Sequence, residues 1–66
     1  MEETNLARIR REKGFSQGGL SKAAGVNVRI IQHYEIRQRN INRAAIETVK
    51  KLADALGVNI TDIMED

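Results

Sequence analysis

Residues 17–35, QGGLSKAAGVNVRIIQHYE, decide the fold of this chain. Apolar residues recur at helical spacing on both sides of Gly25, which indicates two short helices separated by a tight turn. Gly25 can supply the positive φ that such a turn requires, and Ser21 is small enough to let the two helices cross closely. The apolar contact between the two helices would consist of Leu20, Ala24, Val26 and Ile31. The outer face of the second helix would then present Val28, Arg29, Gln32 and His33.

Three further helical stretches surround these two. The first covers about residues 5–13, with Thr4 or Asn5 as its cap and Gly14 at its end. Ser16 and Asn27 can cap the two central helices. Asn42 is expected to cap a fourth helix, which ends at Gly57 and buries Ile46, Val49, Leu52, Ala53 and Leu56. A fifth begins at Asn59, with Asp62 at the capping-box position. The sequence therefore predicts an all-α, compact five-helix domain spanning residues 1–66, with Phe15 and Tyr34 in its core.

The composition of the 66 residues excludes several classes of protein. The chain has no cysteine and one histidine, His33, so neither a disulfide nor a metal site is expected. No nucleophile is accompanied by a base, and no phosphate loop is present, so we expect neither enzyme activity nor a cofactor. No apolar run is long enough to span a membrane, and the polar start excludes a signal peptide. We expect a cytoplasmic protein.

The net charge of +2 hides an uneven distribution of charged residues. Residues 8–43 contain nine bases and two acids, whereas residues 44–66 contain two bases and five acids. A block with a net charge of +7 could face a polyanion, although from charge alone an ordinary solvated surface is equally consistent.

Taken together, the motifs resemble those of the Cro/repressor (Xre-type) helix-turn-helix family of bacterial and phage regulators. The matching pieces extend from Leu6 to Met64. They are residues 9–17 (IRREKGFSQ), Leu20, residues 24–26 (AGV), Ile31, residues 34–35 (YE) and residues 52–58 (LADALGV).

The resemblance implies roles for particular residues. It places Arg10 and Glu35 in a partly buried ion pair between the first and third helices. It places Gln17 near a phosphate, where it could also brace the first residue of the recognition helix, residues 27–35. The major groove would be read by Asn27, Val28, Arg29, Gln32 and His33. The loop that follows would lie along the phosphates with Arg37, Arg39, Asn40 and Arg43.

The chain departs from the family pattern at three places. Gly18 and Gly19 replace helix-forming residues, so the second helix is expected to fray, and alanine at both positions should raise the melting temperature. Residues 36–37 are Ile-Arg where the family often has Asn-Gly, which predicts a different turn. Ile30 is apolar where exposure is expected, and it could contact DNA, a partner chain or the loop.

The expected function is sequence-specific binding of double-stranded DNA by a repressor-like transcription regulator of bacterial or phage origin. A homodimer would place two recognition helices about 34 Å apart, with Ile60 and Met64 as candidate contacts. Two alternatives stay open. One is a protein-interaction module such as an antitoxin, which an exposed apolar patch of Ile30, Ile36 and Ile41 would favour. The other is a non-specific, nucleoid-type DNA binder.

Overall fold

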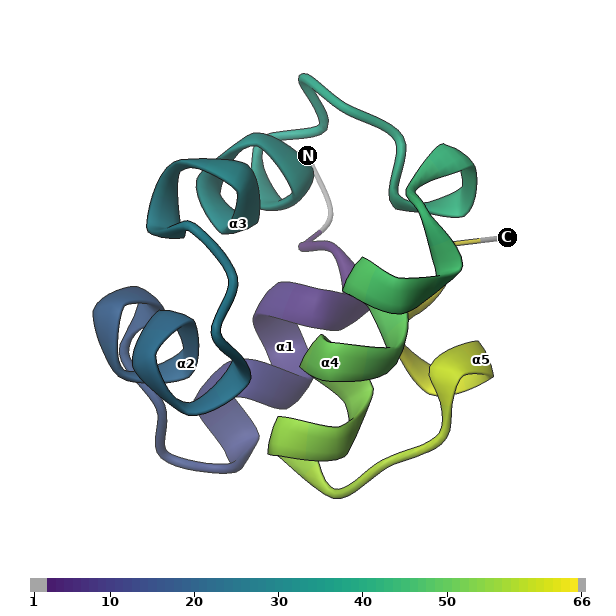
Figure 1. Ribbon diagram of the computed structural model, residues 1–66. Coiled ribbons are helices and arrows are strands. Elements are labelled where there is room, and N and C mark those ends of the chain that lie inside the picture. The colour runs from purple at the N-terminus through teal and green to yellow at the C-terminus, as the bar shows by residue number, and fades with distance from the viewer. Residues whose placement is uncertain (1–2, 66) are drawn as a thin grey trace.

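The computed structural model describes residues 3–65, which contain five α-helices and one short 3-10 helix and no strand (Figure 1). The α-helices are α1 (Asn5–Glu12), α2 (Gln17–Ala24), α3 (Val28–Glu35), α4 (Ile46–Leu56) and α5 (Ile60–Ile63), and the 3-10 helix is η1 (Ile41–Arg43). The all-helical prediction, with α2 and α3 joined by a tight turn, is confirmed. None of the helices within residues 3–65 has both the length and the apolar character needed to cross a bilayer.

Local caps begin the first three helices where the sequence predicts them. Thr4 Oγ1 accepts a hydrogen bond from Ala7 N at 3.1 Å, and Ser16 Oγ accepts one from Gly19 N at 2.9 Å. Asn27 Oδ1 accepts one from Arg29 N at 2.8 Å. Each bond satisfies a backbone donor that has no partner within its helix, which fixes where the helix starts. Gly25 ends α2 in the left-handed region at φ 68°, as the turn between α2 and α3 requires.

The start of α4 differs from the prediction. Asn42 does not cap this helix but lies inside η1, and α4 begins only at Ile46, after Ala45 and without a side-chain cap. The side chain of Asn42 is used elsewhere, because its Oδ1 accepts a hydrogen bond from Glu65 N at 2.9 Å. Asn40 caps η1 instead, through a 2.9 Å bond from Asn42 N to Asn40 Oδ1.

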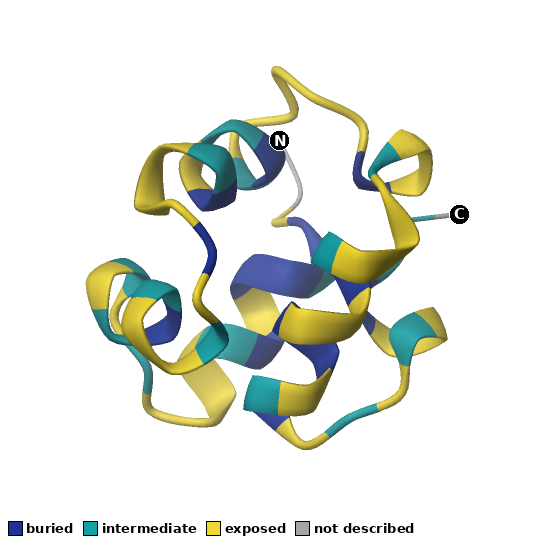
Figure 2. Ribbon diagram, viewed as in Figure 1, coloured by how far each residue is buried: buried dark blue, intermediate teal, exposed yellow. Residues whose placement is uncertain are grey.

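Faces of all five α-helices and of η1 enclose one apolar core, with the exposed faces of α2 and α3 on one side of the molecule (Figure 2). Phe15 packs at its edge. The buried cluster consists of Leu6, Ile9, Leu20, Val26, Ile31, Tyr34, Ile41, Val49, Leu52, Ala53, Leu56 and Ile63. The prediction for Ile46 is wrong, since its side chain is 65% exposed. Ile41 enters the core from η1, and Ile46 stays outside on the first turn of α4.

The two glycines in the first turn of α2 differ in the space around them. A Cβ added at Gly18 would meet nothing within 4 Å, but one added at Gly19 would lie 3.0 Å from Ser16 Oγ, the atom that caps the helix. We therefore expect Gly18→Ala to stabilise the chain by about 0.5–1 kcal/mol through helix propensity. In a thermal melt followed by circular dichroism, this is a rise of about 2–8 °C. Gly19→Ala should gain clearly less, and equal gains at both positions would contradict the steric argument.

Candidate nucleic-acid interface

The helix α3 has one anchored face and one exposed face. Ile31 and Tyr34 are buried on the anchored face. Asn27, Val28, Arg29 and Gln32 are exposed, as expected. The expectation for His33 is wrong in part, because the residue is only partly exposed and its Nδ1 is buried without a hydrogen-bond partner. His33 follows Ile30 by one turn, and Ile30 itself packs against the core, so both lie at the edge of the buried stripe.

Arg10 and Glu35 come together as a bidentate pair between α1 and α3. Arg10 Nε lies 2.7 Å from Glu35 Oε2, and Arg10 Nη2 lies 3.1 Å from Glu35 Oε1. The third nitrogen, Arg10 Nη1, donates to the backbone oxygen of Phe15 at 2.8 Å. The side chains are only 12% and 7% exposed, respectively, so this pair is shielded from solvent. It joins α1, the segment before α2, and the end of α3.

A chain of hydrogen bonds extends from this pair to the exposed face of α3. Gln17 Nε2 donates to Glu35 Oε1 at 2.9 Å, and Gln32 Nε2 donates to Gln17 Oε1 at 3.3 Å. A carboxylate can only accept hydrogen bonds, so Glu35 obliges Gln17 to present its amide nitrogen and to turn its oxygen toward Gln32. Gln17 therefore bonds to Gln32, in the middle of α3, and the bond lies one turn beyond the first residue of the helix. One N–H and the carbonyl oxygen of the Gln32 amide are left for a ligand.

The loop after α3 begins with an unusual backbone conformation. Arg37 has φ 61° and is the one residue other than glycine with positive φ among residues 3–65. This conformation costs a side-chain-bearing residue roughly 1–2 kcal/mol. The turn formed by Ile36 and Arg37 therefore places an arginine in the left-handed region, which glycine favours. Its Nη2 donates to Glu65 Oε1 at 2.9 Å.

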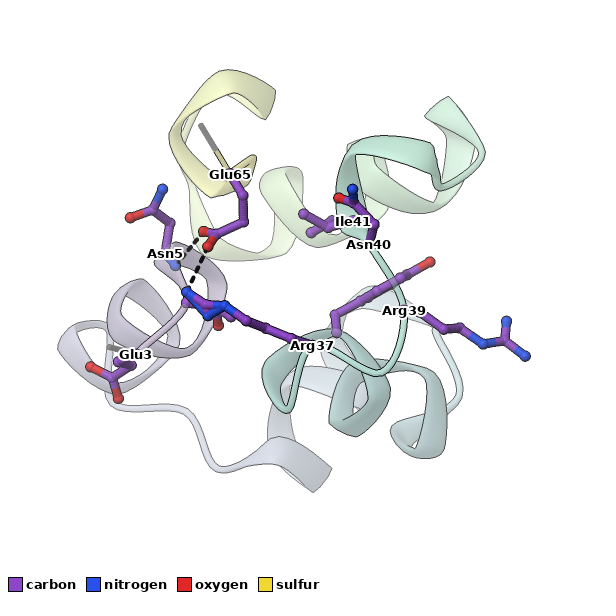
Figure 3. Close-up of a pocket in the computed structure, with 9 residues that line it drawn as sticks. Glu3, Asn5, Arg37, Arg39, Asn40, Ile41 and Glu65 are labelled. Atoms are coloured by element: carbon purple, nitrogen blue, oxygen red, sulfur yellow. Dashed lines mark hydrogen bonds and ion pairs between the residues drawn. The ribbon is translucent and has the colours of Figure 1, made fainter. Parts of the chain in front are cut away.

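The other loop residues named from the resemblance differ in their surroundings. Arg39 and Arg43 are exposed, whereas the Asn40 side chain is occupied in capping η1. Arg37, Arg39, Asn40 and Glu65 are among the residues that line an open pocket of about 510 Å³ between the loop and α1 (Figure 3). In this view the Arg39 side chain extends away from Glu65.

The apolar patch that would favour a protein partner is not formed. Ile41 is 4% exposed and Ile30 is partly buried, which leaves Ile36, at 63%, as its exposed member. Ile60 and Met64, the candidate dimer contacts, are partly buried and pack against the core. Within residues 3–65, no three side chains of the kinds that bind metals gather at one point.

A family model described as Helix-turn-helix matches residues 6–63, nearly the whole chain. The chain belongs to the helix-turn-helix family. The resemblance to Cro/repressor-type regulators is thereby confirmed, and the helix-turn-helix consists of α2 and α3. Membership of this family indicates a DNA-binding regulator of transcription and not an enzyme.

The fold of this helix-turn-helix domain is also found in a solved structure, the N-terminal DNA binding domain of SinR from Bacillus subtilis. The similarity has a TM-score of 0.81 at 23% sequence identity and covers 92% of this chain and 86% of that chain. At this identity the likeness establishes the fold alone. No curated protein matches the chain.

Proposed function

We propose that this helix-turn-helix domain recognises a specific sequence of double-stranded DNA, with α3 in the major groove, and regulates transcription by occupying an operator. The observation that carries the proposal is the exposed face of α3, where Val28, Arg29 and Gln32 lie opposite the buried anchors Ile31 and Tyr34. A helix held in this way can present the same side chains to base edges in every complex.

The chemistry of these three side chains suits the major groove. Arg29 can donate two hydrogen bonds to guanine O6 and N7, the commonest specific contact in protein–DNA complexes. Gln32 retains an amide N–H and an oxygen, the pair that recognises adenine N7 and N6. Val28, 36% exposed, offers an apolar surface that suits a thymine methyl group.

Other residues would contribute affinity without reading the sequence. Arg39 and Arg43 are exposed in the loop after α3, and each could release a counterion by contacting a phosphate. A single module of this size covers only about 600–1,000 Å² of DNA, so we propose that two copies bind together, with recognition helices about 34 Å apart.

Binding-site selection from a randomised duplex pool tests the proposal. We expect an enriched inverted repeat whose half-site contains guanine, where Arg29 reads it. Enrichment of a single short half-site would contradict the proposed dimer but would still support sequence-specific binding. Binding without enrichment would favour a nucleoid-type binder. A chain that retains no duplex at about 50 mM salt, where phosphate contacts are strong, would overturn the proposal in favour of a protein partner.

A further inference from the structure

Glu65 joins three segments that are distant in the sequence. Its carboxylate accepts hydrogen bonds from Asn5 N, at the start of α1, and from Arg37 Nη2, both at 2.9 Å (Figure 3). Its backbone exchanges two hydrogen bonds with the side chain of Asn42, which donates to Glu65 O and accepts from Glu65 N. Glu65, which follows α5, is therefore bonded to α1, to the start of the loop after α3, and to η1.

The two bonded loop residues enclose the segment expected to contact phosphate. Arg37 stands at its start and Asn42 near its end, and residues 38–41 between them include exposed Arg39. The left-handed backbone of Arg37 is unfavourable for a residue with a side chain and persists only where neighbouring groups hold it. Backbone hydrogen bonds of the turn, such as the one from Gln38 N to His33 O at 2.9 Å, supply part of this constraint. The side-chain bond to Glu65 adds to it. Glu65 thus holds the loop at both ends, by its carboxylate at Arg37 and by its backbone at Asn42.

We propose that Glu65 is a positioning residue for DNA binding, which holds the loop of residues 36–45 in the course that brings Arg39 and Arg43 to the phosphates. In this role Arg37 is the attachment point of the loop and not a phosphate contact. The inference rests on the proposed function, since it concerns how this domain grips DNA.

Simple electrostatics makes the opposite prediction for Glu65. A carboxylate beside a DNA-binding loop repels phosphate, so its removal should tighten binding to a polyanion. Positioning predicts weaker binding instead, because the start of the loop would lose the bond between Arg37 and the Glu65 carboxylate. The sign of the change therefore separates the two interpretations.

The experiment compares the full chain with Glu65→Ala, Arg37→Ala and the double variant. Binding to one duplex is measured over a range of salt concentrations, at a temperature where thermal melts show every variant folded. Asp54→Ala is the matched control, because Asp54 is an exposed carboxylate on α4 and its loss changes the net charge equally. Both Glu65→Ala and Glu65→Gln keep the backbone atoms that bond to Asn42. If Glu65→Ala does not fold, Glu65→Gln keeps one acceptor oxygen for Arg37 and should show a smaller loss in the same direction.

We expect Glu65→Ala to weaken binding about 2- to 30-fold. The slope of log K against log salt should decrease by about 0.9 for each phosphate that the released loop no longer reaches. Asp54→Ala should bind as tightly as the unchanged chain or slightly more tightly. The double variant should bind no more weakly than the weaker single variant, because both substitutions release the same loop.

Two results would overturn the inference while leaving DNA binding intact. One is equal or tighter binding by Glu65→Ala. The other is a loss on Arg37→Ala that persists in full when Glu65 is already alanine, which would make Arg37 a direct contact. An unchanged chain that binds no duplex would instead overturn the proposed function, and the inference with it.

Discussion

Arg10→Met is expected to remove about 3–5 kcal/mol of folding stability, because it leaves the Glu35 carboxylate shielded from solvent without its cation. The Glu35 side chain is only 7% exposed, and Arg10 supplies two of the hydrogen bonds that it accepts. The Phe15 backbone oxygen loses its donor as well. A chain of 66 residues has a total stability of about 3–10 kcal/mol, so much of the variant should be unfolded at 25 °C. Urea denaturation followed by circular dichroism measures the loss.

The same helix offers a matched control in Arg8→Met. Arg8 pairs with Glu12 at 3.5 Å, and these side chains are 47% and 59% exposed. Exposed pairs of this kind contribute about 0–1 kcal/mol, so the control should melt close to the unchanged chain. The double variant Arg10→Met/Glu35→Leu should recover part of the loss, because it removes the uncompensated charge. Equal losses for Arg8→Met and Arg10→Met would contradict the shielded pair.

Features set by neighbouring residues could be predicted from the sequence. The caps at Ser16 and Asn27 act over two or three residues, and the turn at Gly25 depends on the freedom of one backbone position. The buried residues of α3 follow from helical spacing, because a helix that packs on one side must repeat its apolar positions. The proximity of Arg10 and Glu35 could not be derived in this way. It came from the family resemblance.

Features that depend on distant residues were missed. Asn42 was expected to act as a helix cap because asparagine favours that position, but its side chain is engaged by Glu65, 23 residues away. Nothing local in the sequence identifies that pairing, so the predicted start of α4 and the predicted burial of Ile46 are wrong as well. Glu65 was not among the candidate site residues for the same reason. A lone carboxylate near the acidic end of the sequence carries no signal of what it will contact.

Arg29→Ala should weaken binding to the selected DNA site by about 5- to 150-fold, the equivalent of 1–3 kcal/mol for one bidentate base contact. Arg29 is the second residue of α3, and the bond from its backbone N to Asn27 Oδ1 fixes the turn from which its side chain extends. The loss should be much smaller on an unrelated duplex, where the arginine has no guanine to recognise. Titration of both duplexes at one salt concentration measures the two losses.

The comparison between the two duplexes separates base recognition by Arg29 from a phosphate contact. Lys51→Ala removes the same charge from an exposed position on α4 and should weaken both duplexes slightly and equally, since it changes only the general field. Base reading predicts that Arg29→Ala lowers the ratio of specific to non-specific affinity and relaxes the preferred base at one position of the half-site. If Arg29 served only as a phosphate contact, the two duplexes would lose affinity by the same factor and the ratio would not change. That result would transfer the specificity to Val28 and Gln32, because they are the other exposed side chains on the same face of α3.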